Sequence, residues 1–351
     1  MSLRQSLIRQ SLSRPLLVLS TPRSPAFTTL SKLYNKHPGL PGENDPGSGT
    51  HSRTDKNVKI QYPLEKNMPR SVPYQGHGGV HDKRTLASFS LEGRTVVVTG
   101  GARGLGLIMA QAAVISGANV ALVDLNEAEA AKQSSAIVSH FKSENPDSSH
   151  TPTVTAHHAD VSNPDSVSAC ITSILSTHQK IDHLITSAGF TENFDAIAYP
   201  PDRMRKLWGV NVDGTYLFAT AVARHLIERK SRGSMVFIGS MSGKIVNIPQ
   251  PQAPYNASKA AVRHLAASLA VEWAHAGIRV NCISPGYMMT ALTRKIMDEN
   301  PELEKKWVSL IPTGKMGSPE DLMGAVVYLL SDAAGYTTGA DLVVDGGYTI
   351  T

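Results

Sequence analysis

The sequence has only two cysteines, Cys170 and Cys282, among its 351 residues. Two cysteines cannot build a disulfide framework, and neither has a cysteine or histidine partner at metal-ligand spacing. No apolar run reaches the ~18 residues that a membrane-spanning helix needs. We therefore expect a protein of a reducing compartment with no membrane partner. Its composition, 41% hydrophobic and 18% charged, is sufficient for a well-buried core.

Acidic residues are absent from the first 42 positions, where arginines are interleaved with Ser, Leu and Ile. These arginines are Arg4, Arg9, Arg14 and Arg23. An Arg-rich, Ser-rich start without acids is typical of a mitochondrial transit peptide, and we expect one over residues 1–36. The alternative is a disordered tail on a cytoplasmic protein. Residues 37–87 are rich in Pro, Gly, His and Asn and lack periodicity, which predicts a linker or extended arm.

The net charge of +5 comes from this leader. Residues 1–85 hold 13 Lys and Arg against 5 Asp and Glu, whereas the rest of the chain holds 21 against 24. Because the basic excess does not belong to the folded part, the charge does not predict a nucleic-acid partner.

From Ser88 on, short apolar runs typical of buried strands alternate with helical patterns. The runs fall at 95–100, 119–124, 153–161, 182–189, 234–240, 279–286 and 341–347. Strands separated by helices of 10–15 residues indicate a parallel sheet. The sequence therefore predicts an α/β fold over residues 88–351, a single Rossmann-type doubly wound sheet of about seven strands with helices on both faces.

The first strand is followed by a glycine-rich turn, "TGGARGLG", with Gly100, Gly104 and Gly106 in its motif positions. Such a turn, leaving a strand and opening a helix, lets backbone N–H groups approach a pyrophosphate. The alternative is a plain glycine-rich turn, but the strand–turn–helix context favours a dinucleotide cofactor.

Asp124 ends the second strand, 18 residues after Gly106. A carboxylate there accepts hydrogen bonds from the adenosine ribose and repels a 2′-phosphate. Arg103 could instead attract that phosphate, or pair with Asp124. We therefore favour NAD(H) and keep NADP(H) as the alternative.

Tyr255 and Lys259 stand four residues apart in "YNASK", so on a helix they share one face. A tyrosine with a pKa near ~10 is a poor base at neutral pH, and a nearby ammonium lowers that pKa. The alternative is a packed tyrosine beside a lysine that extends to the surface.

Eight motifs occur in the order found in short-chain dehydrogenases/reductases, and the chain resembles that family over roughly residues 88–351. They are "TGGARGLG" (99–106), "ADV" (159–161), "SAG" (187–189), "NVDG" (211–214), "GSMSG" (239–243), "YNASK" (255–259), "SPG" (284–286) and "VVDGG" (343–347). The stretches "AGFTENF" and "VDGGYT" look closest to fungal polyol and ketose enzymes, such as D-arabinitol 2-dehydrogenase, sorbose reductase and mannitol 2-dehydrogenase.

The resemblance implies a catalytic tetrad. Tyr255 would be the general acid/base, Lys259 would also hold the nicotinamide ribose, Ser240 would hydrogen-bond the reacting oxygen, and Asn211 would complete a water-linked proton relay. Ser242 is a second candidate for the serine, because it stands 13 residues before the tyrosine instead of 15.

The resemblance also implies further cofactor contacts, with Ser187 replacing the family's usual asparagine. They are Leu105, Asp160, Val161, Ser187, Gly189, Pro285, Gly286, Met288 and Thr290. Histidines 157 and 158 adjoin on a strand and therefore point to opposite faces, so we expect no metal site there.

The expected reaction interconverts a secondary alcohol and a ketone, with a polyol/ketose pair such as D-arabinitol and D-ribulose as the substrate. Glu192, Asn247 and Tyr287 are the candidate substrate residues, and residues 287–307 are the candidate lid. A 3-oxoacyl-thioester reductase and a non-catalytic dinucleotide sensor are the alternatives. Family members are commonly homotetramers, with an interface formed by residues 200–230 and 254–276.

Overall fold

The computed structural model describes residues 85–148 and 151–351. The predicted transit peptide lies outside the described residues, and so does the predicted linker except for its last three residues. Those three begin a short 3-10 turn, Thr85–Phe89. No helix within the described ranges is both long and apolar enough to cross a bilayer.

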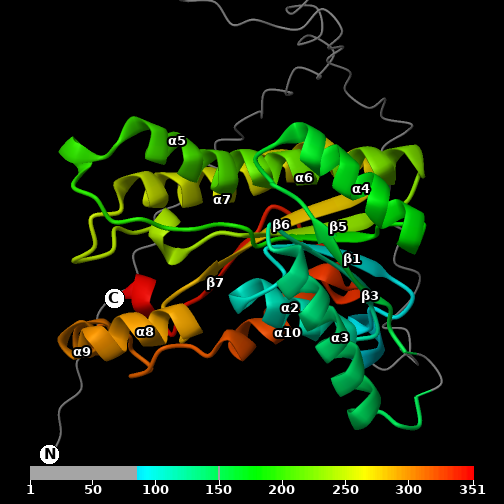
Figure 1. Ribbon diagram of the computed structural model, residues 1–351, viewed down its shortest axis with the longest axis horizontal. Helices are drawn as coiled ribbons and strands as arrows, with labels where there is room; N and C mark the ends of the chain where they lie inside the picture. Colours follow the sequence, from blue (N-terminus) through cyan, green and yellow to red (C-terminus); the bar gives the residue numbers. More distant parts are fainter. Residues whose placement is uncertain (1–84, 149–150) are drawn as a thin grey trace, which may run out of the picture. The chain divides into compact units, whose positions relative to one another are not determined.

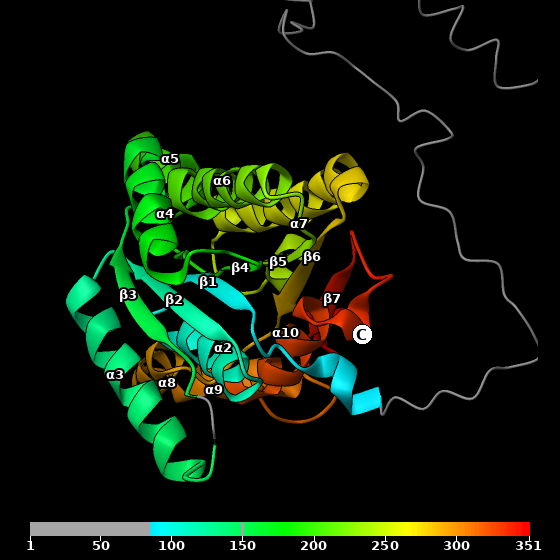
Figure 2. The same cartoon turned by 90° about the vertical axis from the view of Figure 1, so that its right-hand side faces the viewer.

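Seven parallel strands form one sheet in the order β3-β2-β1-β4-β5-β6-β7, as Figures 1 and 2 show. Their bounds are β1 Thr95–Thr99, β2 Asn119–Asp124, β3 Val154–His158, β4 His183–Thr186, β5 Gly233–Ile238, β6 Ile278–Pro285 and β7 Asp341–Val344. The prediction of a doubly wound parallel sheet is confirmed.

Helices cover both faces of this sheet (Figure 2). One layer holds α4 (Pro164–His178), α5 (Pro201–Trp208), α6 (Gly214–Glu228) and α7 (Ala253–Trp273). The other holds α2 (Gly104–Ile115), α3 (Glu127–Glu144), α8 (Ala291–Glu299), α9 (Pro301–Ser309) and α10 (Met323–Leu330). Helices α8 and α9 follow the loop after β6, so the candidate lid is a pair of short helices.

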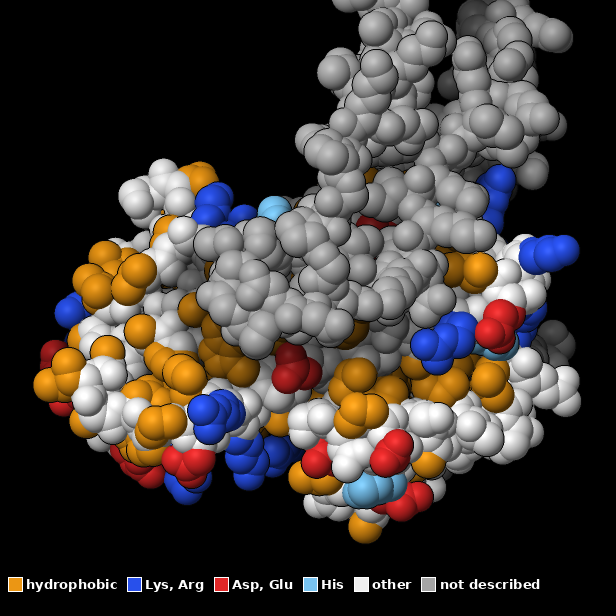
Figure 3. All heavy atoms as spheres, turned by 90° about the horizontal axis from the view of Figure 1, so that it is seen from above, with side chains coloured by type: hydrophobic (Ala, Val, Ile, Leu, Met, Phe, Trp, Pro, Cys, Tyr) orange, Lys and Arg blue, Asp and Glu red, His pale blue; other side chains and the backbone are white. Residues whose placement is uncertain are grey.

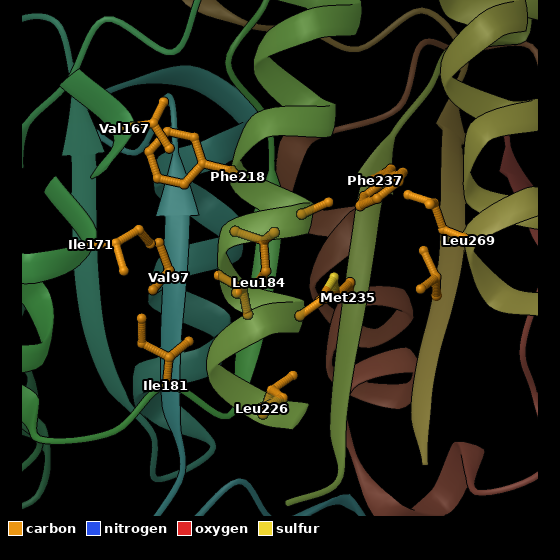
Figure 4. Packing of buried hydrophobic residues seen from close by; sticks show 14 of the residues in the cluster. Val97, Val167, Ile171, Ile181, Leu184, Phe218, Leu226, Met235, Phe237 and Leu269 are labelled. Carbon is orange, nitrogen blue, oxygen red and sulfur yellow. The ribbon is translucent and has the colours of Figure 1, made fainter. Parts of the chain in front are cut away.

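The sheet is buried on both faces because its strands are continuous runs of apolar residues. Successive residues alternate between two cores: Val97 lies in the core under α4, α6 and α7, whereas Val96 and Val98 lie in the core under α2 and α10. Figure 4 shows Val97 in the first core with residues such as Leu184 and Phe237.

Asp182 is nearly fully buried where β4 begins, and it makes a charged network at the edge of the sheet where the strands start. Its carboxylate accepts from the Thr95 backbone N–H at 2.9 Å, from Lys180 at 2.9 Å and from Arg229 at 2.7 Å. The network ties the start of β1 to the start of β4. Because all strands are parallel, this network lies at the N-terminal ends of the strands, whereas the glycine-rich turn lies at their C-terminal ends.

Several strands are shorter than the sequence predicts. β3 ends at His158 instead of 161, because the Asp160 carboxylate turns back to accept hydrogen bonds from the backbone and hydroxyl of Ser162. β7 ends at Val344, before Gly346 and Gly347, whose φ angles of 63° and 92° cannot continue a strand.

Candidate functional site

The candidate site lies where the strand order reverses, between β1 and β4. In open α/β sheets the crevice at this switch point, beyond the carboxyl ends of the strands, receives the ligand. A Cβ atom on Gly100 would lie 2.8 Å from the backbone of Ala188, so only glycine lets the two strand ends come this close. The turns carrying Gly100 and Ser187 therefore meet at the ends of β1 and β4.

The glycine-rich turn leaves the start of α2 open. A Cβ on Gly106 would lie 2.2 Å from the Gly100 carbonyl oxygen, whereas Gly104 has φ 58° and a Cβ there would meet nothing within 4 Å. Helix α2 begins at Gly104, has no acidic residue in its first turn, and receives no side-chain cap from Arg103. Unfilled N–H groups at a helix N-terminus fit a pyrophosphate.

Asp124 is already engaged with the turn. Its two carboxylate oxygens accept from the backbone N–H groups of Ala102 at 3.1 Å and Asn126 at 3.0 Å. Arg103 is exposed, and the ion pairs among the described residues do not include Arg103 with Asp124. The Asp124 carboxylate thus ties the glycine-rich turn to the end of β2, and it would be the acceptor for an adenosine ribose.

A cavity of about 760 Å³ adjoins the turn and separates α2 from α8 and α9. Gly104 and Thr290 both line it, so two predicted cofactor residues distant in the sequence border one space. Met288 does not contribute its side chain, which is buried in the core against Gly317. Any cofactor contact of Met288 is therefore through its backbone.

The remaining predicted cofactor residues surround this region. Leu105 packs partly against the core, Val161 is buried against Gly214, and Asp160 is exposed beside Ser162. Ser187 is partly exposed at the end of β4. A Cβ on Gly286 would lie 2.7 Å from Asp345, so the turn after Pro285 needs glycine to reach the last loop of the chain.

Asn211 is fully buried in a short π-helix, Gly209–Asp213, between α5 and α6. Its amide exchanges two hydrogen bonds with the backbone of Phe190 and donates to the Ser258 hydroxyl at 3.1 Å. A Cβ on Gly189 would lie 3.1 Å from the Asn211 oxygen and 3.6 Å from Lys259 Nζ. Asn211 and Lys259 thus meet beside Gly189, and irregular helix turns of this kind are frequent at functional sites.

Lys259 is buried, and its ammonium donates to the Ile238 carbonyl at 2.8 Å. Burial lowers the pKa of Lys259 to about 8. Lys259 Nζ lies 5.8 Å from the centre of the Tyr255 ring. The shared helix face predicted for these two residues is present on α7.

Tyr255 differs from the expectation in its electrostatics. Burial raises the pKa of the Tyr255 phenol, and a hydrogen bond with Ser240 acts in the opposite direction. The prediction that Lys259 brings this pKa down is not met in the chain alone: Lys259 is not among the groups that lower it, and burial keeps it above the ordinary value.

Ser240 lies at the end of β5 and begins the turn Met241–Gly243. Its hydroxyl oxygen accepts from the backbone N–H of Ser242 at 3.1 Å and lies 3.0 Å from the Ser242 hydroxyl. Ser242 is buried beneath it. Of the two candidates, Ser240 is the one that lowers the pKa of the Tyr255 phenol, and Ser242 hydrogen-bonds Ser240.

Comparisons with known proteins agree with this arrangement. Residues 100–349 match a family model described as enoyl-(acyl carrier protein) reductase. The chain is 43% identical over 268 residues to D-arabinitol 2-dehydrogenase [ribulose-forming] of Scheffersomyces stipitis, covering 75% of this chain and 96% of the relative. It is 38% identical over 284 residues to NADP-dependent mannitol dehydrogenase of Hypocrea jecorina, covering 80% and 99%.

Among solved structures, a short-chain type dehydrogenase/reductase from Mycobacterium marinum is similar with a TM-score of 0.70 and 33% identity, over 76% of this chain and all of that one. The chain belongs to the short-chain dehydrogenase/reductase family. As a member of it, this protein is an NAD(P)-dependent alcohol dehydrogenase or ketoreductase.

Two of the three candidate substrate residues of this dehydrogenase lie together. Asn247 is buried and donates to the Tyr287 hydroxyl at 3.2 Å. Tyr287 stacks on Trp307 of the lid, with ring centres 4.3 Å apart. Glu192 is not part of these contacts. Its carboxylate instead pairs with Arg203 and accepts a hydrogen bond from the Tyr199 hydroxyl. Glu192 is therefore better described as part of an ion pair than as a free acceptor for substrate.

Several residues of this region were not found from the sequence. Ser258 joins Asn211 to α7. In the amide orientation that turns its oxygen toward the lid, Gln250 accepts hydrogen bonds from the Tyr287 hydroxyl and the Trp307 indole. Ser258 lies in the motif "YNASK", three residues after Tyr255, and this spacing could have indicated its place beside the tetrad. Gln250 and Trp307 lie far apart in sequence and gave none.

The two adjacent histidines do lie on opposite sides of β3, His157 buried and His158 exposed. The ring nitrogens of His157 lie 2.8 Å from the Thr155 hydroxyl and 3.0 Å from the Ser173 hydroxyl. Within residues 85–148 and 151–351, no three His, Cys, Asp or Glu side chains are grouped as metal ligands.

Replacing Lys259 by methionine should stabilise this dehydrogenase at pH 7, because a buried ammonium costs the folded state free energy. With the pKa of Lys259 at about 8, the cost reaches up to about 3 kcal/mol. Both states are charged below pH 8, and the folded state alone loses the proton between about pH 8 and 10.5. The advantage of Lys259→Met should therefore shrink as the pH rises through that window.

Urea unfolding of both proteins at pH 7 and pH 10 measures this difference. A Lys259→Met variant less stable than the wild type at pH 7, or a difference independent of pH, would contradict the assigned burial.

Proposed function

We propose that the protein interconverts a polyol and the corresponding ketose, such as D-arabinitol and D-ribulose, with NAD(H) as the preferred cofactor. The observation that carries the proposal is the pairing of a phenol and a buried ammonium on one face of α7, with the Ser240 hydroxyl on the phenol. A non-catalytic sensor of dinucleotides has no use for that pairing, which argues against that alternative.

Each side chain of the tetrad has a distinct task in the proposed reaction. Tyr255 takes the proton of the alcohol in oxidation and returns it in reduction. Ser240 holds the reacting oxygen at the phenol, and Lys259 holds the nicotinamide ribose. Asn211, with both amide atoms tied to Phe190, keeps the relay behind Lys259 in place. The bound nicotinamide accepts or supplies the hydride.

The open start of α2 and the cavity beside it are consistent with a bound dinucleotide. Asp124 supports NAD(H), because a carboxylate at the ribose repels the 2′-phosphate of NADP. The relative from Hypocrea jecorina is named for NADP, so members of the family differ in this preference, and Arg103 is the residue through which this chain could accept the phosphate.

Two unpaired amide oxygens support the polyol assignment, one of them on Asn256, which follows Tyr255 in the sequence. Among the described residues, the side-chain oxygens of Asn247 and Asn256 are buried without a hydrogen-bond partner. An unpaired buried acceptor costs about 1–3 kcal/mol, which a substrate hydroxyl would recover. A 3-oxoacyl thioester offers no hydroxyl donors along its chain, so these amides favour a polyhydroxylated substrate over that alternative.

A substrate panel tests the proposal. We expect purified protein to reduce NAD with five- or six-carbon polyols, and to oxidise NADH with the matching ketoses, faster than with acetoacetyl thioesters. Tyr255→Phe should lose turnover by orders of magnitude while still binding the cofactor, because the geometry is kept and the transferable proton is lost. Tyr199→Phe, which likewise removes only a phenolic hydroxyl, is the matched control.

Absorbance of the reduced cofactor follows these reactions. Higher activity on acetoacetyl thioesters than on every polyol and ketose would overturn the substrate class. Activity of Tyr255→Phe within tenfold of the wild type would overturn the role of the phenol.

The cofactor preference is tested with Asp124→Asn, which keeps one oxygen for the turn and removes the charge. We expect the ratio of kcat/KM for NAD to that for NADP to fall, because repulsion of the 2′-phosphate is lost. A wild-type enzyme that already prefers NADPH would show that Arg103 dominates the choice.

We also propose a homotetramer assembled through α5, α6 and α7. Large hydrophobic side chains are exposed there, including Tyr216 and Ile227 on α6 and Val271 on α7. Figure 3 views the molecule from this side, and in the part of the surface that is visible hydrophobic side chains lie among charged ones. Light scattering should give the mass of four chains, and the mass of one chain would refute the assembly.

A further inference from the structure

Arg263 stands one helical turn beyond Lys259, so Tyr255, Lys259 and Arg263 follow each other at intervals of four along one face of α7. Arg263 is only partly exposed, and its guanidinium is engaged by neighbouring groups of the chain. Its Nε donates to Asp341 at 2.6 Å, and its NH1 group donates to the Gly243 carbonyl at 2.7 Å.

The same arginine contacts both ends of the turn that carries Ser240. A Cβ on Gly239, directly before Ser240, would lie 3.3 Å from Arg263 Cγ, so the aliphatic part of Arg263 packs against the start of the turn. Gly243, whose N–H donates to the Ser240 carbonyl at 2.9 Å, is the end of the turn held by the guanidinium.

Asp341, the first residue of β7, extends this contact to the cofactor side. Its second oxygen accepts from the buried Ser284 hydroxyl at 2.5 Å. Ser284 directly precedes Pro285 and Gly286. One ion pair therefore joins the turn of Ser240 to the end of β6.

We propose that Arg263, held by Asp341, is a positioning residue that sets Ser240 against Tyr255. Arg263 acts through the turn and touches neither substrate nor cofactor. The inference rests on the proposed role of Ser240, and it adds a determinant outside the tetrad.

The geometry explains why an arginine suits this position. A guanidinium is planar and carries several donors in a fixed fork, so it can serve Asp341 and Gly243 at the same time. A lysine has a single charged head that cannot hold both acceptors in this arrangement. Misplacing a reacting group by about 1 Å can cost ~10²-fold in rate.

A double-mutant cycle tests the inference. Arg263→Met keeps the aliphatic packing and removes both hydrogen bonds, and it should lower kcat about 10- to 100-fold with KM for NADH nearly unchanged. In the Ser240→Ala background, Arg263→Met should have little further effect, because the group it positions is gone. Arg263→Lys should give an intermediate loss.

The pH profile gives a readout that lost stability alone would not move. The Ser240 hydrogen bond lowers the pKa of Tyr255. Arg263→Met should therefore shift the pKa on the acidic limb of the pH profile of polyol oxidation upward, because Tyr255 must be deprotonated to take the alcohol proton. Arg229→Met is the matched control: it breaks the partly exposed ion pair with Asp182 at the opposite edge of the sheet and should leave kcat and this pKa unchanged.

The outcomes separate the two proposals. Equal losses from Arg263→Met with and without Ser240, or an unchanged pH profile, overturn the positioning role. If Ser240→Ala is inactive and Arg263→Met retains full kcat, only the further inference fails. If Ser240→Ala retains full activity, the assigned role of Ser240 fails and the inference fails with it. If Arg263→Met does not fold, Asp341→Asn replaces it in the same cycle.

Discussion

Helix α7 lies directly against the turn after β5, and the rest of the site depends on this contact. A Cβ on Gly243 would lie 2.7 Å from the Lys259 carbonyl carbon, so two backbones touch where any larger residue would push them apart. The contact brings Ser240, from the turn after β5, close to Tyr255 and Lys259 of α7. Lys259 strengthens it by donating back to Ile238, the last residue of β5.

The electrostatics of this site are set by exclusion of water. Burial raises the pKa of the Tyr255 phenol and lowers the pKa of the Lys259 ammonium, so both groups are shifted toward their neutral forms. The lowered pKa brings Lys259 closer to neutral pH, whereas the raised pKa of Tyr255 lies further from it. The fold thus spends stability to bury the Lys259 ammonium beside the Tyr255 ring.

The sequence predicts the sheet, the glycine-rich turn and the helix face of Tyr255 and Lys259, because each depends on local spacing. It does not predict strand ends such as that of β3, where the Asp160 side chain competes with the ladder. Nor does it predict the contacts of Glu192 with Arg203 or of Tyr287 with Trp307, since these pairs form only when separate loops fold together. Arg263 falls between these cases: its spacing from Lys259 was visible, but its acceptors on β7 and on the turn were not.

The most direct test of the account follows the hydrogen on the reacting carbon. Incubation of the enzyme and NAD with a polyol deuterated at its secondary carbinol carbon should give reduced cofactor that carries deuterium, as measured by mass spectrometry. The rate should fall relative to unlabelled polyol if hydride transfer limits turnover. Reduced cofactor without the label, or no reduced cofactor with any polyol, would contradict the proposed reaction.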